Sequence, residues 1–174
     1  MNGDKVCTLV FLRKNDEILL AMKKRGFGTG HWNGAGGKIE LGETVEQAMI
    51  RETQEEIEVT PAKYEKVAEH NFLMDVNTQN PYHIYVHAFI AHEWEGEPSE
   101  TEEMAPKWFN IDEIPYDSMW EDDPIWLPLV LEGKKVIGKY TFNSNNKMIT
   151  HEVKEVDTLP GIIPSKPVNI ERIL

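Results

Sequence analysis

Residues 37–59 read GKIELGETVEQAMIRETQEEIEV, and this stretch is the most informative part of the chain. Thr44 is followed three residues later by Gln47, which is the spacing of a capping box, and no Gly or Pro interrupts the next dozen residues. A helix is therefore predicted to begin near Val45. Its inward side is marked by apolar residues at helical spacing, namely Val45, Ala48 and Met49.

Three glutamates, Glu52, Glu55 and Glu56, follow on the same helix within five positions. A cluster of this kind is commonly a solvated helix face. At about 100° per residue, however, the apolar stripe continues one turn onward onto Glu52, so these carboxylates are expected to face inward. Like charges three and four residues apart destabilise a helix unless a cation lies between them. The stretch therefore predicts a divalent-metal site, and Mg²⁺ held by carboxylates implies a substrate that carries phosphates.

A Gly-rich run, formed by Asn33, Gly34, Ala35, Gly36 and Gly37, precedes this helix. Glycine allows the backbone to approach a ligand closely or to turn sharply. The run lacks the Lys-Ser/Thr ending of a Walker A loop and does not fit a dinucleotide-binding fingerprint, which excludes both interpretations. Its significance comes from the acidic helix that follows it.

The whole segment resembles the Nudix box, Gly-x5-Glu-x7-Arg-Glu-U-x-Glu-Glu-x-Gly-U, in which U is a bulky aliphatic residue. The specified positions up to the last glutamate are all matched, by Gly37, Glu43, Arg51, Glu52, Glu55 and Glu56. Two positions depart from the pattern. Thr53 stands where an aliphatic residue is usual, and Glu58 stands where the family has Gly at the helix end. The helix therefore lacks the residue that usually assists its exit.

Four further segments extend the resemblance to the eukaryotic MutT-homologue branch, the oxidised-purine nucleoside triphosphatases. They read MKKRGFGTGHWNGAGGK (22–38), EMAPKWF (103–109), MWEDDPIWLPLVL (119–131) and EVDTL (155–159). The resemblance covers about residues 6–159 and implies an α+β Nudix fold, in which a mixed β-sheet is sandwiched between α-helices. We accordingly expect a Nudix hydrolase domain over residues 4–159 and a C-terminal extension over 160–174.

The resemblance also implies a base-binding site around Trp120, Asp122 and Asp123. From composition alone, these residues would be an exposed turn before Pro124. In the branch, the matching aspartates read the purine edge, the matching Trp stacks on the base and an Asn at position 33 bonds it from across the pocket. Two adjacent carboxylates cannot both ionise easily, so one becomes a protonated donor. Further expected contacts to the substrate come from Thr8, Lys23, Phe27, Asn33, Phe72 and Trp126.

The reaction implied by the resemblance is metal-assisted hydrolysis of 8-oxo-dGTP and 2-hydroxy-dATP to a monophosphate and pyrophosphate, which cleanses the nucleotide pool. Mg²⁺, with Mn²⁺ as a substitute, would neutralise the triphosphate and position a water for attack. Its expected ligands are Gly37, Glu52, Glu55, Glu56 and Glu103. Arg51 is expected to orient the glutamates, and either Glu56 or Glu103 would take the proton. Two alternatives stay open. One is a Nudix hydrolase of another nucleoside diphosphate-linked substrate, such as a normal or methylated nucleotide, an alarmone or a sugar diphosphate, and the other is a catalytically silent Nudix-fold binding module.

Composition limits the partners and the compartment. A chain of 174 residues with 40% hydrophobic content suffices for one domain with a core. The net charge of −12 disfavours a nucleic-acid polymer or an anionic membrane as partner. The only cysteine, Cys7, lies in an apolar run and is expected to be a buried thiol of an intracellular protein. We expect a cytoplasmic monomer, with the nucleus or mitochondria as alternatives, whose partner is a small nucleotide.

Apolar runs predict strands over residues 5–13, 17–24, 64–74, 83–92, 106–111, 136–142 and 148–156, and short helices at 112–114 and 124–131. His83 and His87 are expected as a surface pair rather than metal ligands. Segment 160–174 is rich in proline and is expected to be an extended tail, frayed by default. Docking of this tail would use Ile170, Ile173 and Leu174.

Overall fold

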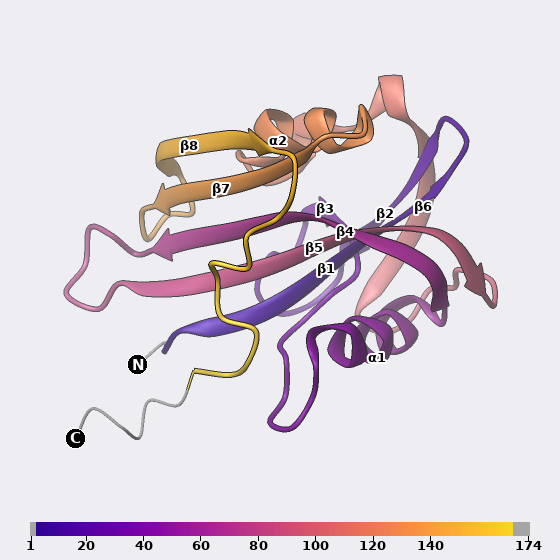
Figure 1. Cartoon of the computed structure of the whole chain (residues 1–174), viewed down its shortest axis with the longest axis horizontal. Coiled ribbons are helices and arrows are strands. Elements are labelled where there is room, and N and C mark those ends of the chain that lie inside the picture. Colours follow the sequence, from indigo (N-terminus) through magenta and orange to yellow (C-terminus); the bar gives the residue numbers. More distant parts are fainter. Residues whose placement is uncertain (1–2, 169–174) are drawn as a thin grey trace.

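The computed structural model describes residues 3–168 and contains a mixed sheet of eight strands with two α-helices. Figure 1 shows the arrangement. The elements, in chain order, are β1 (Lys5–Lys14), β2 (Glu17–Lys23), β3 (Trp32–Asn33), α1 (Val45–Ile57), β4 (Thr60–Met74), β5 (Tyr82–Glu95), β6 (Met104–Asn110), η1 (Ile111–Glu113), η2 (Tyr116–Ser118), α2 (Asp123–Leu131), β7 (Lys135–Phe142) and β8 (Met148–Val156). The predicted α+β class is confirmed, and the predicted strands are found with ends that shift by a few residues.

The sheet runs in the order β3-β2-β1-β5-β4-β7-β8, and β6 pairs with β2 outside this path. The pairs β1–β5 and β4–β7 are parallel, whereas the remaining pairs are antiparallel. The two helices lie on opposite sides of the sheet (Figure 1). The expected sandwich of a mixed sheet between helices is therefore confirmed.

Alternate residues of β1 face the two helices, as the pleat of a strand requires. Val10 and Leu12 pack in a cluster with Met49 of α1, whereas Phe11 packs in a cluster with Trp126 of α2. All these side chains are at most 2% exposed. One strand thus fixes both helices relative to each other, and with them the two groups of acidic residues that they position.

Helix α1 begins where the sequence predicts. The Thr44 Oγ1 accepts a hydrogen bond from the Gln47 N–H at 3.1 Å, and the Gln47 side chain accepts one from the Thr44 N–H at 3.0 Å. Thr53, the first departure from the Nudix pattern, is fully buried and donates from Oγ1 to the Met49 carbonyl at 2.7 Å. Its hydroxyl is therefore satisfied inside the helix, and no polar atom is left unpaired by the substitution.

The C-terminal segment differs from the frayed tail that we expected. Residues 160–168 run across one face of the sheet (Figure 1), and buried Glu69 accepts hydrogen bonds from the N–H groups of Gly161 and Ile162, both at 3.0 Å. His87 is only 2% exposed, and its Nε2 lies 2.7 Å from the Pro164 carbonyl oxygen, so the expectation of a surface pair is wrong for this histidine. The expected docking residues Ile170, Ile173 and Leu174 lie outside the described residues, and the domain boundary at 159 stays a prediction.

Helix α1 ends at Glu58, which adopts the left-handed conformation (φ 62°, ψ 30°) and donates its N–H to the Gln54 carbonyl. This conformation disfavours residues with a Cβ by about 1 kcal/mol. We predict that Glu58→Gly raises the free energy of unfolding by about 0.5–1 kcal/mol, because glycine adopts this conformation without the steric penalty. The matching rise in Tm is about 1–4 °C, measurable by thermal unfolding.

Glu58→Ala is the matched control for this prediction. It removes the same carboxylate but retains the Cβ, so we expect little or no rise in Tm. If Glu58→Ala stabilised the protein as much as Glu58→Gly, the effect would belong to the lost negative charge rather than to the backbone conformation.

Candidate active site

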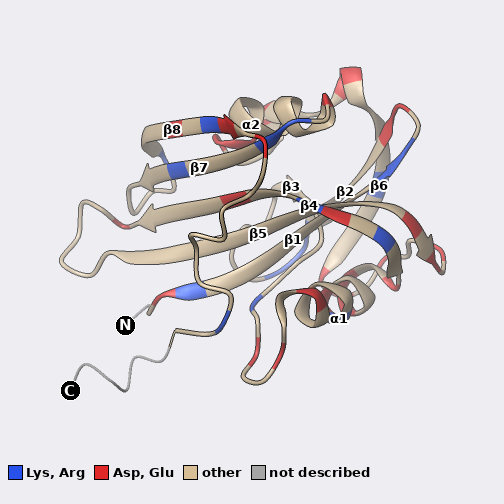
Figure 2. Ribbon diagram, in the orientation of Figure 1, with Lys and Arg blue, Asp and Glu red and all other residues tan. Residues whose placement is uncertain are grey.

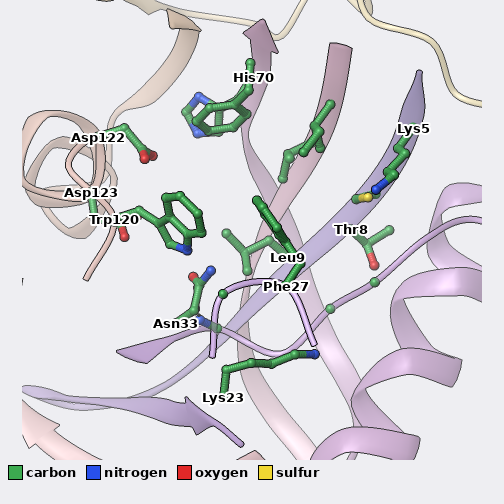
Figure 3. A pocket seen from close by; sticks show the side chains of 18 of the residues that line it. Lys5, Thr8, Leu9, Lys23, Phe27, Asn33, His70, Trp120, Asp122 and Asp123 are labelled. Atoms are coloured by element: carbon green, nitrogen blue, oxygen red, sulfur yellow. Dashed lines mark hydrogen bonds between the residues drawn. The ribbon is translucent and has the colours of Figure 1, made fainter. Parts of the chain in front are cut away.

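One cavity of about 460 Å³ joins the two regions that the sequence singled out. Lys23 and Glu56 line it on the side of the Gly-rich loop, whereas Trp120, Asp122 and Asp123 line it on the side of α2. Figure 3 shows Lys23 near one end and the two aspartates near the other. Its volume is in the range of small-molecule sites. The cavity is thus large enough to take a ligand that extends from one acidic region to the other.

The predicted site residues divide into two groups. Eleven of them line the cavity, namely Thr8, Lys23, Phe27, Asn33, Gly37, Glu56, Phe72, Trp120, Asp122, Asp123 and Trp126. Arg51, Glu52, Glu55 and Glu103 do not. Glu52 instead lines a neighbouring cavity of about 530 Å³, and Lys5 and Lys38 line both cavities.

Glu56 is the acidic residue of α1 that reaches the cavity. Its side chain is 3% exposed, forms an ion pair with Lys23 Nζ at 3.5 Å and accepts a hydrogen bond from the Gly36 N–H at 3.0 Å. Burial raises the pKa of Glu56 to about 7, and the negative charges of Glu52 and Glu103 add to this effect. A carboxyl group with a pKa near neutrality can both take and release a proton at the pH of a cell.

Glu52 lies against the backbone of Gly37. A Cβ on Gly37 would overlap the Glu52 carboxylate, so a larger residue at this position would displace that carboxylate. The pKa of Glu52 is raised, first by burial and further by the charges of Glu55 and Glu103. Carboxylate oxygens and a backbone are thus crowded together, as expected where a hard cation binds oxygen ligands.

Arg51 connects α1 to the loop that precedes it. Its Nε and Nη2 donate to the two oxygens of Glu43 at 2.5 and 2.9 Å, and Nη2 also donates to the Lys38 carbonyl at 3.0 Å. Its Nη1 donates to Glu52 at 2.9 Å and to Glu55 at 3.3 Å. The Arg51 hydrogen bond lowers the pKa of Glu43. The guanidinium therefore fixes the position of Glu52 relative to the Gly-rich loop.

Glu103 lies near the other acidic residues but is held by Arg25, whose Nη2 is 3.2 Å from its carboxylate. Within residues 3–168, no three His, Cys, Asp or Glu side chains are grouped as a ready set of metal ligands. Each glutamate is instead held by a cation, namely Arg51, Lys23 or Arg25. The oxygen donors and the glycine against Glu52 nevertheless fit a hard divalent cation better than a transition metal that prefers nitrogen or sulfur.

Asp122 and Asp123 are buried, so the alternative of an exposed turn is wrong. They are 3% and 2% exposed, and Trp126 Nε1 donates to Asp122 Oδ2 at 2.9 Å. The Asp123 Oδ2 has no hydrogen-bond partner among the described residues. Burial raises the pKa of Asp122 to about 6 and that of Asp123 well above its usual range, where the charge of Asp122 adds to it. The pair therefore retains a proton under conditions in which exposed aspartates are ionised.

Aromatic rings form the wall beside these aspartates. Trp120 packs on Phe27 with ring centroids 5.1 Å apart and on His31 at 4.7 Å, both nearly parallel. Phe27 is itself 53% exposed, so it lies at the mouth of the cavity. Phe72 stacks on Tyr140 at 4.7 Å deeper in the molecule. The rings thus offer flat apolar surfaces to a flat ligand.

Asn33 and Thr8 present polar groups to the same cavity. The Asn33 Oδ1 accepts a hydrogen bond from the Gly34 N–H at 2.8 Å, which fixes the side-chain amide. Thr8 is buried rather than solvent-facing, and its Oγ1 has no hydrogen-bond partner within the described part of the chain. Both side chains line the cavity.

Several residues that line the cavity could not be predicted from the sequence. They include Leu9, His70, Met74, Ile84, Val86 and Met104. Most are ordinary apolar strand residues, and they come together only because β5 pairs with β1 and β4, and β6 pairs with β2. His70 is the one polar member of this group, and its sequence neighbours contain no motif that marks it.

Comparison with known proteins identifies the family of the chain. Residues 1–130 match the family described as NUDIX domain. The chain belongs to the Nudix family. Nudix hydrolases generally require a divalent metal ion, and this Nudix protein carries the box on α1 and the loop before it.

Two curated relatives of this Nudix protein match it over nearly their whole length. The zebrafish (Danio rerio) protein named "Oxidized purine nucleoside triphosphate hydrolase" is 43% identical over 91% of this chain and 100% of its own. The mouse (Mus musculus) protein of the same name is 39% identical over 91% of this chain and 99% of its own. The crystal structure of the MutT protein from Bacillus halodurans has a TM-score of 0.75 and 23% identity, and covers 86% of this chain and 97% of that one. This last match supports the fold alone.

The buried aspartates predict a pH-dependent stability. Because Asp122 and Asp123 keep protons in the folded state after the unfolded chain has lost them, stability should fall as the pH rises from about 4 through 6 and beyond. Asp123→Asn removes one of the two charges and should flatten this decline. Between pH 4 and pH 8 the difference in stability between the two proteins should therefore shift in favour of the variant. Urea unfolding at several pH values measures the slope.

Asp117→Asn serves as the control, because Asp117 is exposed and lies in the same stretch of chain. It should keep the slope of the wild type. Parallel pH profiles for Asp123→Asn and the wild type would contradict the assignment of retained protons to the buried pair.

Proposed function

We propose that this Nudix protein hydrolyses oxidised purine nucleoside triphosphates, in particular 8-oxo-dGTP and 2-hydroxy-dATP, to the monophosphate and pyrophosphate, and so cleanses the nucleotide pool. The observation that carries the proposal is a single cavity with a buried aspartate pair on one side and Glu56 of the acidic helix on the other. The names of the zebrafish and mouse relatives support the same substrate class. The net charge of −12 suits a free nucleotide bound with a cation better than a nucleic-acid polymer.

The aspartate pair would read the base. A buried pair that retains one proton offers both a hydrogen-bond donor and acceptors, so it can match more than one purine edge. Trp120 would stack on the base, and the fixed amide of Asn33 would bond to it from across the cavity. The remaining contacts would come from the side chains of Thr8, Phe27, Phe72 and Trp126, which line the same cavity.

The acidic helix would hold the triphosphate through Mg²⁺, for which Mn²⁺ could substitute. The residues that would bind the ion are Gly37, Glu52, Glu55, Glu56 and Glu103. When bound, such an ion neutralises phosphate charge and makes a coordinated water more acidic. Figure 2 shows acidic residues over α1 and the loop before it, so phosphates would not remain here without added positive charge. Lys23, which pairs with Glu56, supplies part of that charge.

One residue would orient the glutamates, and another would accept the proton from the attacking water. Arg51 would orient Glu52 and Glu55 through its hydrogen bonds rather than contact the substrate. Glu56 is favoured over Glu103 as the base, because it lines the cavity. Glu103 lies outside the lining and is bound to Arg25.

The cytoplasmic location and the monomeric state stay predictions from the sequence. Neither helix within residues 3–168 is long and apolar enough to cross a membrane.

The function is tested by pyrophosphate release from 8-oxo-dGTP, 2-hydroxy-dATP, dGTP and dATP in parallel, with Mg²⁺ and with Mg²⁺ replaced by EDTA. We predict a preference for the two oxidised substrates and no turnover with EDTA. Glu56→Gln should lower kcat by at least about 100-fold, since it removes a group that takes part in proton transfer. Glu46→Gln is the matched control, because Glu46 is exposed in the first turn of the same helix.

Each of the other outcomes would favour a different function. Equal turnover of all four nucleotides would retain the hydrolase but remove the role in damage recognition. Absence of turnover, together with weak Mg²⁺ binding, would favour a silent binding module.

A further inference from the structure

His70 is a polar residue of the cavity that the proposed function leaves unused. It lies in β4, is 0% exposed and lines the cavity together with Asp122 and Trp126. Figure 3 shows its ring at the end of the pocket where Asp122 and Trp120 lie, away from Lys23. The residue is therefore at the base end of the site rather than at the triphosphate end.

Three aromatic rings fix the orientation of this histidine. Its ring centroid lies 4.4 Å from that of Trp126, 5.5 Å from that of Tyr140 and 5.8 Å from that of Phe72. The Tyr140 hydroxyl lies 3.3 Å from His70 Nδ1. Gly138 pairs with His70 across the sheet, and a Cβ there would overlap both the hydroxyl and Nδ1. Glycine in β7 thus leaves room for this hydrogen bond.

The hydrogen bond to Tyr140 determines which nitrogen carries the proton. Burial lowers the pKa of His70 to about 3, so the ring is neutral and has one N–H and one lone pair. A phenol is a stronger acid than an imidazole N–H, and an imidazole lone pair is a stronger acceptor than a phenol oxygen. The Tyr140 hydroxyl therefore donates to Nδ1, and the hydrogen of the ring is placed on Nε2.

The Nε2 atom has no hydrogen-bond partner among the described residues, although it is fully buried. A buried donor without an acceptor destabilises the protein, and most such groups in folded proteins are paired. The Asp122 carboxyl group, which accepts a hydrogen bond from Trp126, lies at the same end of the cavity but not within hydrogen-bond distance of Nε2 (Figure 3). A ligand that fills the base end of the cavity would supply the missing acceptor for the Nε2–H.

We propose that His70 is a specificity-determining residue of the base site, and that its Nε2–H donates to a carbonyl oxygen of the purine. The inference rests on the proposed function, because it takes the ligand to be a purine. Carbonyl oxygens are strong acceptors, and oxidation adds one to the ring. 8-Oxoguanine carries two carbonyl oxygens, whereas adenine has none. Tyr140 acts through His70 and is a positioning residue.

Two substitutions at this position distinguish the effect of losing the N–H donor from the effect of changing the volume of the side chain. His70→Leu removes the N–H, whereas His70→Gln carries an amide N–H close to the place of Nε2. We expect His70→Leu to lower kcat/KM for 8-oxo-dGTP about tenfold relative to that for dATP, through KM and with kcat little changed. His70→Gln should restore the ratio to within about threefold of the wild type. Tyr140→Phe should give a smaller loss in the same direction, because either tautomer of His70 then becomes available.

Equilibrium binding of 8-oxo-dGMP and dAMP to the same variants provides a readout that needs no catalysis. The two dissociation constants should change in the same ratio as KM, while Tm reports any loss of folding. An equal loss for both bases, or a loss confined to kcat, would reduce His70 to a structural residue and overturn the proposal. An unchanged ratio in His70→Leu would overturn it as well.

The failure of the proposed function has a different signature. A wild-type protein that turns over all four triphosphates equally, yet shows the His70→Leu effect on 8-oxo-dGMP against dAMP, would retain the His70 contact and lose the role in damage recognition. A wild-type protein that binds neither monophosphate would overturn both.

Discussion

The site depends on the Arg51 guanidinium, which holds the acidic helix to the loop in front of it. Its planar fork binds both oxygens of Glu43, and its remaining N–H groups reach Glu52 and the Lys38 carbonyl. A lysine at this position has a single ammonium group and could not bond to all these partners in fixed directions. Because Glu52 is thereby pressed against Gly37, one side chain places both the carboxylate and the backbone of the metal-binding region.

The Gly-rich loop transmits this placement to the sheet. The Thr8 N–H donates to the Gly37 carbonyl at 2.9 Å, and the Val10 N–H donates to the Ala35 carbonyl at 2.7 Å, so the loop pairs with β1 like an additional strand. A Cβ on Gly36 would overlap the Thr8 carbonyl. The glycines therefore allow the loop to lie directly on the strand whose alternate residues pack against α1 and α2. In this way a motif that is local in the sequence is set at a fixed distance from the aspartates of α2.

Local patterns explain why α1 could be predicted and its surroundings could not. The capping box and the apolar period act within a few residues, and both are found where the sequence places them. The base end requires residues that are close only in the folded sheet. His70 meets Tyr140 because β4 and β7 pair in parallel, and the alternation of apolar and polar residues along either strand does not reveal that register. The expectation that His87 lies at the surface is wrong for a similar reason, because a segment 77 residues away in the chain covers it. The resemblance to a known branch predicts the roles of the aspartates and Trp120, but it does not predict a role for a histidine outside the matching motifs.

The proposed function needs ionised carboxyl groups at one end of the cavity and a protonated carboxyl group at the other. Burial raises the pKa of Glu56 at one end and of Asp123 at the other, so desolvation alone does not distinguish them. The difference lies in the cations. Lys23 faces Glu56 and lowers its pKa against the effect of burial, whereas the described residues form no ion pair with Asp122 or Asp123. A carboxyl group with a cation beside it can lose its proton and attract a metal ion, while a buried pair of carboxyl groups without a cation must retain one. The placement of a few basic residues thus divides one acidic cavity into a region suited to phosphates with a metal ion and a region suited to the edge of a neutral base.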